Sequence, residues 1–132
     1  MKLPGDRTDH ASLSSIGSEA ARLFASKQYH QLASEFGYAL SGDRPTADAL
    51  HYDVRRCLAD DGRHAMLDSS VDAEISVSYF TPNESSLFAL VECFMPLEGD
   101  PGSMLVELIV TTSGNDRSIC VEDITYAPPI GV

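Results

Sequence analysis

The second half of this sequence has almost no basic residues. Residues 64–132 contain eleven Asp and Glu but a single base, Arg117, which gives that half a net charge of −10. Residues 1–63 contain nine acidic and eight basic residues, a net charge of −1, so nearly all of the total of −11 falls in one half. Neither half has a basic cluster, which argues against nucleic acid and anionic membranes as partners. We expect one structural layer to be acidic and the other nearly neutral.

The sequence also lacks long apolar runs and metal-binding motifs. No segment approaches the roughly 18 apolar residues of a membrane span, and the first residues, MKLPGDRTDHASLSS, have no apolar stretch of the kind found in secretory signals. The three cysteines lack the spacing of metal ligands, and no two of the four histidines are three or four residues apart. We therefore expect free buried thiols, a cytoplasmic protein, no metal and no cofactor.

Residues 11–62 have the apolar spacing of helices. Apolar side chains recur there at steps of three and four, and a change of phase at ASKQY (25–29) predicts a bend or short break. Thr46 predicts the N-cap of a further helix, which is expected to stop at Gly62.

After residue 63 the apolar period changes to that of strands. In AEISVSYF, for example, Ile75, Val77 and Tyr79 alternate with polar residues. Four such segments follow with short connections, at 73–80, 87–95, 104–112 and 118–126. Helices followed by sequential strands are typical of an α+β domain, in which an antiparallel meander packs against helices. We expect a single domain over 1–132, with an arm at 1–10, helices at 11–62, a curved sheet of about four strands at 63–127 and a tail at 128–132.

A bent helical region containing KQYHQLASEF (27–36), a second short helix and a curved C-terminal meander resemble the cone-shaped, nuclear-transport-factor-2-like superfamily. The resemblance covers most of the chain and rests on the order of the elements. It implies a pocket between helices and sheet, which hosts acid–base catalysis in some members. The chain's size, its acidity and the closing segment VEDITY (121–126) also resemble small acidic bacterial immunity proteins, which neutralise a toxin domain.

Three Val-Glu pairs recur every fifteen residues, and their glutamates are Glu92, Glu107 and Glu122. Directly opposed residues of an antiparallel pair have a constant index sum. Glu107 opposite Glu122 requires a turn centred on the Gly-Asn pair of SGND (113–116), which is a recognised hairpin signal.

Glu92 opposite Glu107 requires a turn centred on the Gly-Asp pair of EGDP (98–101). Pro101 has no amide hydrogen to close a tight turn there. A wider loop would shift the register by one residue and place Glu92 opposite Val106, on the other face.

If both registers hold, one face of the sheet carries the three glutamates among aromatic and aliphatic side chains. Like charges opposed across strands are unfavourable, so the row makes sense if something cationic and partly apolar covers it. The alternative is that these are the outward glutamates of alternating strands, with neighbours covered by the chain itself or by a twin subunit. The predicted partner-binding residues are Glu92, Glu107, Glu122, Phe88, Phe94 and Tyr126.

Catalysis is a rival interpretation. The sequence has no G-x-S-x-G elbow, no phosphate-binding glycine loop and no H-E-x-x-H. Asp123 alternates onto the core face with Val121 and would there be a buried carboxylate of raised pKa. Tyr29 and His51 are the residues predicted to complete its pocket, with Tyr38 and Tyr52 as further candidates. The other reading of Asp123 is a residue near a strand end, with its carboxylate in water or bound to a backbone amide.

The sequence therefore favours a non-enzymatic protein-binding module whose acidic sheet layer engages a basic partner. The most concrete version is an immunity protein or antitoxin that covers a nuclease-type toxin domain, since nucleases bind phosphates through Lys and Arg. Two alternatives stay open. One is a small-molecule-binding or acid–base catalytic pocket of the cone-shaped type. The other is a homodimer that hides the glutamate face against its own copy, although two acidic faces repel each other.

Overall fold

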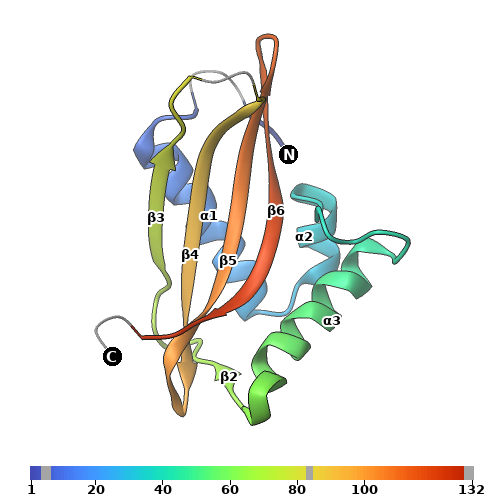
Figure 1. Ribbon diagram of the computed structural model, residues 1–132, viewed down its shortest axis with the longest axis vertical. Helices are drawn as coiled ribbons and strands as arrows, with labels where there is room; N and C mark the ends of the chain where they lie inside the picture. The colour runs from blue at the N-terminus through green and yellow to red at the C-terminus, as the bar shows by residue number, and fades with distance from the viewer. Residues whose placement is uncertain (4–6, 83–84, 130–132) are drawn as a thin grey trace.

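A computed structural model describes residues 1–3, 7–82 and 85–129, without the side chain of residue 61. In that part of the chain, three α-helices pack against a six-stranded antiparallel sheet, so the predicted α+β class is confirmed (Figure 1). The helices are α1 (His10–Ala25), α2 (Tyr29–Glu35) and α3 (Thr46–Ala59), followed by a 3₁₀ turn, η1 (Asp60–Gly62). No described helix is both long enough and apolar enough to cross a membrane.

The expected meander consists of β3 (Glu74–Tyr79), β4 (Leu87–Glu98), β5 (Asp100–Ser113) and β6 (Asp116–Ala127). Two further strands, β1 (Lys2–Leu3) and β2 (Met66–Leu67), bring the described strands to six instead of about four. Each has only two residues, too few to show an alternating pattern in the sequence. The order is β1-β6-β5-β4-β2, and β3 also pairs with β4.

The break predicted at 25–29 separates α1 from α2. Lys27 adopts a left-handed conformation with φ of 59°. Its amide donates to the carbonyl of Phe24 at 3.1 Å, and the amide of Gln28 donates to the carbonyl of Leu23 at 2.9 Å. These bonds close the end of α1 in the manner of a Schellman cap.

The boundaries of α3 differ slightly from the prediction. Thr46 is the first helical residue, and the N-cap is Pro45, which has an extended conformation and no side-chain cap. The α-helix ends at Ala59, and the 3₁₀ turn continues to Gly62, whose φ of 74° suits glycine.

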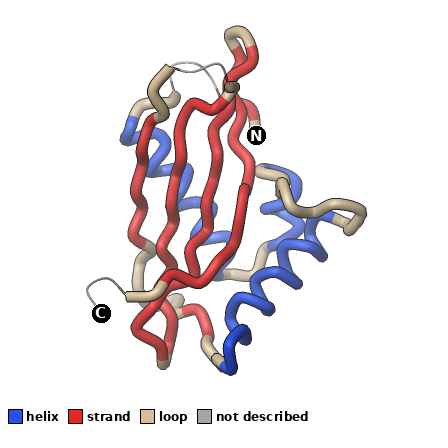
Figure 2. The backbone as a smooth tube through the Cα atoms, viewed as in Figure 1, coloured by secondary structure: helices blue, strands red, loops and turns tan. Residues whose placement is uncertain are grey.

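α1 lies across one face of the sheet, against β3 and β4. In Figure 1 the strands face the viewer and α1 runs behind them, and Figure 2 shows no described helix in front of the long strands. The face toward α1 is the core face and is closed to solvent. Its buried strand residues include Ala89, Val91, Cys93, Met95, Met104, Val106, Leu108, Val110, Ile119, Val121 and Ile124. The opposite face, called the open face below, has no described helix over it and is available for binding.

Some predicted segments fall partly outside the described residues. These are residues 4–6 of the arm, 83–84 of the turn before β4 and 130–132 of the tail; the first two tail residues, 128–129, have no regular structure.

Candidate functional site

Glu92 and Glu107 are directly opposed on β4 and β5, as predicted. The hairpin between these strands turns tightly at Glu98 and Gly99, with Leu97 paired to Asp100, so the predicted turn centre at the Gly-Asp pair is wrong by one residue. The register then shifts before the next pair, Pro96 with Ser103, which leaves Pro101 and Gly102 unpaired. A bulge of this kind absorbs a residue that has no amide hydrogen to donate. The alternative register, one residue out of step, is wrong.

The predicted opposition of Glu107 and Glu122 is wrong, although the predicted Gly-Asn turn at 113–116 is confirmed. Asp123 is the residue opposite Glu107, because the register of β5 and β6 shifts by one residue next to this pair. Glu122 is the extra residue of the bulge and is exposed.

The bulge also changes the face on which Asp123 lies. An extra residue reverses the alternation, so Val121 and Ile124, three positions apart, both reach the core. The prediction that Asp123 alternates onto the core face with Val121 is therefore wrong. Asp123 is half-buried opposite Glu107, and its Oδ1 accepts a hydrogen bond from the amide of Ile124 at 2.9 Å.

Four carboxylates thus gather on three neighbouring strands. We call them the acidic row: Glu92, Glu107, Glu122 and Asp123. Paired residues on either side of the row form what we call the two flanking rungs. One rung is Leu90, Ile109 and Cys120, and the other is Phe94, Leu105 and Thr125. Apart from exposed Thr125, these side chains are half-buried. Along the strands, the open face therefore has a largely apolar rung, then the acidic row, then a second largely apolar rung.

The centre of the acidic row is under electrostatic strain. Partial burial raises the pKa of Glu107, and the charges of Asp123, Glu92 and Glu122 raise it further. Both effects disfavour the ionised form. A cation next to Glu107 would favour the ionised form and so counteract both effects.

The described ion pairs lie away from the acidic row. Within the helical layer, Arg22 pairs with Glu19 at 2.6 Å and Arg44 with Asp53 at 3.1 Å. At the edge of the sheet, Lys2 pairs with Asp116 at 3.8 Å. In the part of the chain that the structure describes, no His, Cys, Asp and Glu side chains are grouped so as to hold a metal ion.

Of the three predicted aromatic anchors, Phe94 lies on the open face and Phe88 does not. Phe88 falls where the register of β4 and β5 shifts between Leu87 and Ala89, and it packs against the core. The Arg117 guanidinium lies 3.9 Å from the centre of its ring, and Tyr79 meets the ring edge-on at 5.6 Å. Phe88 is thus a packing residue.

Tyr126 also packs against the core, because it follows the bulge at Glu122. Its hydroxyl donates to Oδ1 of Asp100 at 2.7 Å, and the Arg63 guanidinium lies 3.8 Å from its ring centre. The ring covers Gly102, where a Cβ would lie 2.3 Å from the hydroxyl oxygen. A Cβ there would also lie 2.7 Å from the backbone oxygen of Ala127, so the close approach of the strands requires glycine at this position.

The three residues of the alternative pocket do not come together. Tyr29 and His51 stack with ring centres 4.7 Å apart and planes at 14°. They line a hollow of about 420 Å³ between the end of α1, α3 and β2, and Asp123 is not among its lining residues. Tyr29 and His51 therefore line one pocket, as predicted, but the predicted acid is not part of it.

Sequence reasoning missed a polar network beside the open face. The Tyr38 hydroxyl donates to the buried carboxylate of Asp53, which Arg44 also binds. Tyr38 forms a bridge with Val121 of β6, so the network ties the 38–44 loop and α3 to the sheet edge. Spacings of fifteen and nine residues give no local signal for such a contact.

Comparison of the chain with protein-family models, with curated proteins and with solved structures found no match.

Proposed function

We propose that this protein is a non-enzymatic binding module that covers a basic protein partner with the open face of its sheet. One observation carries the proposal: four carboxylates lie together between two rungs of half-buried, largely apolar side chains, on a face that no described helix covers. A partner that offers cationic side chains between apolar ones complements this pattern.

The partial burial of the acidic row, in addition to its negative charge, favours a cationic partner. Glu107 is already half-buried among like charges, which weakens the isolated fold. A bound Lys or Arg would relieve that repulsion and, as the interface closes, would do so with little screening by water. Phe94, Leu105 and Ile109 would supply apolar contact on either side, and Phe94 is the candidate anchor.

The concrete form of the proposal is an immunity protein or antitoxin for a nuclease-type toxin. Such a toxin binds phosphates through basic side chains, and an acidic sheet offers the opposite charge. The charge distribution supports this, because residues 64–132, which build five of the six described strands, carry −10 of the net −11. A homodimer through the same face is disfavoured, because it would oppose two acidic rows.

A peptide of alternating lysine and valine, carrying a fluorescent label, tests the face directly. Fluorescence anisotropy is expected to show binding that weakens as salt rises, whereas a glutamate–valine peptide does not bind. The double variant Glu92→Gln/Glu107→Gln is expected to bind the basic peptide about tenfold more weakly.

The matched control is Asp43→Asn/Glu98→Gln, which removes the same charge from exposed positions away from the acidic row. It is expected to change the affinity by less than about twofold. Equal weakening by both double variants would mean that the peptide responds to net charge, and the assigned face would be wrong.

The toxin-directed form needs its own experiment. If a toxin-bearing reading frame lies beside the gene, the two products are co-expressed and purified through a tag on one of them. A stable complex that the Glu92→Gln/Glu107→Gln variant no longer forms supports the immunity role. A neighbouring toxin that never co-purifies with the wild-type chain contradicts that role and leaves the basic-peptide result to stand by itself.

A further inference from the structure

A second surface feature lies on the helical side of the molecule, away from the acidic row. The hollow of about 420 Å³ next to the Tyr29–His51 stack is walled by apolar side chains from α1, α3 and β2. The apolar lining residues are Ala25, Val54, Leu58, Met66 and Leu67. Met66 is 62% exposed, an unusual degree for a methionine next to an apolar wall. The volume falls within the range of about 300–1,000 Å³ typical of small-molecule sites.

The charge of this hollow is opposite to that of the molecule. No acidic residue lines it, although the chain has a net charge of −11. Its charged lining residues are Lys27 and Arg55, both exposed at the surface. In the described part of the chain, no ion pair joins either of them to a carboxylate, in contrast to Arg22 and Arg44. Two neighbouring hollows do have acidic lining residues. One shares Ala25, Leu67 and Ser69 and is lined by Asp68 and Asp72, and the other shares Lys27, Tyr29 and His51 and is lined by Asp48. Of these three hollows, only the one of about 420 Å³ has basic lining residues and no acidic one.

The backbone at Lys27 is a second, independent observation. Every other described residue with a positive φ is a glycine, whereas Lys27 has a φ of 59°. A side chain with a Cβ is disfavoured in this conformation, and glycine is the usual residue at this position of a helix end. A lysine kept where glycine fits better points to a use for its ammonium group.

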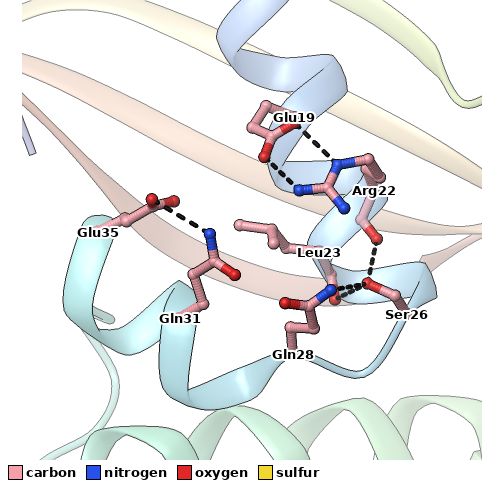
Figure 3. Close-up of polar contacts among 7 residues, drawn as sticks. All are labelled: Glu19, Arg22, Leu23, Ser26, Gln28, Gln31 and Glu35. Atoms are coloured by element: carbon pink, nitrogen blue, oxygen red, sulfur yellow. Dashed lines mark hydrogen bonds and ion pairs between the residues drawn. The ribbon is translucent and has the colours of Figure 1, made fainter.

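The turn around Lys27 is also braced, as Figure 3 shows for the residues on either side. The Ser26 hydroxyl donates to the carbonyl of Arg22 at 2.8 Å and accepts a hydrogen bond from the Gln28 side chain at 3.1 Å. Arg22 in turn donates two hydrogen bonds to Glu19, at 2.9 and 2.6 Å. The contacts of Ser26 join the last turn of α1 to Gln28, the residue after Lys27.

The wall beside Lys27 is flat and rigid. Tyr29 is buried, and its ring stacks on His51 with only 14° between the planes. Stacked rings keep their orientation, and His51 is the exposed ring of the pair. The hollow thus combines an aromatic wall, an aliphatic floor and two cations.

We propose that this hollow binds an amphipathic anion, a carboxylate on a short hydrocarbon chain. The carboxylate lies between Lys27 and Arg55, and the hydrocarbon chain lies along Val54, Leu58 and Met66. Charge-assisted hydrogen bonds fix the head group, and burial of the apolar chain supplies the rest of the affinity. This site does not depend on the function proposed for the open face.

Octanoate is the probe, added to the full chain and followed by ¹H–¹⁵N NMR shifts and by isothermal titration. We expect saturable shifts that centre on residues 25–29, 51–58 and 66–67. Octanol, which has the same chain without charge, is expected to bind at least roughly tenfold more weakly, and octyltrimethylammonium more weakly still. Octanol that binds as well as octanoate would overturn the anion-binding site, as would an absence of saturable shifts.

Two variants and one matched control locate the head group. Lys27→Gly removes the ammonium and relieves the left-handed strain, so its melting temperature is expected to equal or exceed that of the wild type while octanoate affinity falls roughly tenfold. Arg55→Gln is expected to weaken octanoate similarly. Arg56→Gln removes the neighbouring charge, which does not line the hollow, and is expected to change the affinity by less than about twofold. Equal effects at residues 55 and 56, or full binding by Lys27→Gly, would contradict the assignment.

Discussion

Glu92 and Glu107 lie directly opposite each other on β4 and β5, and Asp123 continues the row on the far side of Glu107. Opposed like charges destabilise a sheet by a few tenths of a kcal/mol to about 1 kcal/mol per pair. The pairing therefore weakens the fold unless a ligand compensates it. This links the proposed function to a property that can be measured without any partner.

Replacing Glu107 with Gln is expected to stabilise the free protein at neutral pH by about 0.5–1 kcal/mol. Burial and the neighbouring carboxylates raise the pKa of Glu107 above its ordinary value of 4.5. A raised folded-state pKa means that the ionised form destabilises the fold. The penalty is present at neutral pH and disappears as pH falls through the folded-state pKa toward the ordinary one. Urea denaturation at about pH 7 and about pH 4 measures the difference, which is expected to shrink at the lower pH.

Glu98→Gln is the control for this measurement. Glu98 is exposed at the end of β4, so the change is expected to stay within about 0.5 kcal/mol at both pH values. A Glu107→Gln variant that is less stable than the wild type at neutral pH would show that the carboxylate makes a favourable contact, contrary to the strain inferred for the row.

Local patterns in the sequence were enough to predict most of β3, β4 and β5. Side chains alternate strictly within a regular strand, so the core positions Val91, Val106 and Leu108 follow from period two alone. The Gly-Asn turn at 113–116 also follows from local chemistry, because glycine and asparagine tolerate the left-handed conformations that a two-residue hairpin needs.

The bulges could not be predicted in the same way. A bulge adds one residue to one strand and reverses the faces of everything beyond it, without a change in composition. This single effect explains the three misplaced residues: Phe88 lies within one bulge, and Asp123 and Tyr126 lie at or beyond another. In β6 the predicted faces hold before the bulge at Glu122 and are reversed beyond it, whereas in β4 the bulge lies at the start of the strand and the predicted register holds after it.

Gly17→Ala is expected to destabilise the protein by about 1–3 kcal/mol, even though alanine favours helix by about 1 kcal/mol. A Cβ at Gly17 would lie 2.9 Å from the side chains of both Ile75 and Val91. α1 would have to move away from the sheet, or these two side chains would have to leave their rotamers. Thermal and urea denaturation measure the loss. Ser18→Ala, at an exposed position on the same helix, is the control and is expected to be neutral or slightly stabilising. An alanine at 17 without penalty would mean that α1 packs less closely than the structure has it.

Tyr38→Phe is expected to destabilise the fold by about 1.5–3 kcal/mol at neutral pH, because a buried carboxylate loses a hydrogen-bond donor. Burial pushes the pKa of Asp53 upward, but hydrogen bonds from Arg44 and Tyr38 outweigh it and leave the pKa below the ordinary 3.8. A lowered folded-state pKa means that the ionised carboxylate stabilises the fold above pH of about 4 and stops doing so as pH falls further.

The effect of Tyr38→Phe is accordingly expected to be largest at neutral pH and smaller near pH of about 3, as read from urea midpoints. Tyr52→Phe removes a hydroxyl from the exposed side of the same region, where the side chain is 61% exposed, and serves as the control. Equal losses in the two variants would contradict a specific contribution of the Tyr38–Asp53 bond.

Cys120 provides a reporter of the potential on the open face. It lies on the Leu90–Ile109 rung beside the acidic row and is partly accessible, whereas Cys93 is fully buried and burial raises the pKa of its thiol to about 12. We expect a cationic methanethiosulfonate reagent, with a trimethylammonium group, to modify Cys120 at least roughly fivefold faster than its sulfonate analogue at low salt. Mass spectrometry after stopped reactions gives both rates and the site.

The ratio of the two modification rates also distinguishes the effect of the acidic row from the effect of the net charge of the molecule. It is expected to fall toward one at high salt, since the potential at a surface is screened over about 10 Å at 0.1 M. The rate ratio is also expected to fall in Glu107→Gln/Glu122→Gln, which removes two glutamates of the acidic row. It is expected to stay near the wild-type value in Asp43→Asn/Glu98→Gln, which has the same net charge as the first double variant. A ratio close to one in the wild-type protein would show that the acidic row does not generate a negative potential on this face, and the electrostatic basis of the proposed binding surface would be lost.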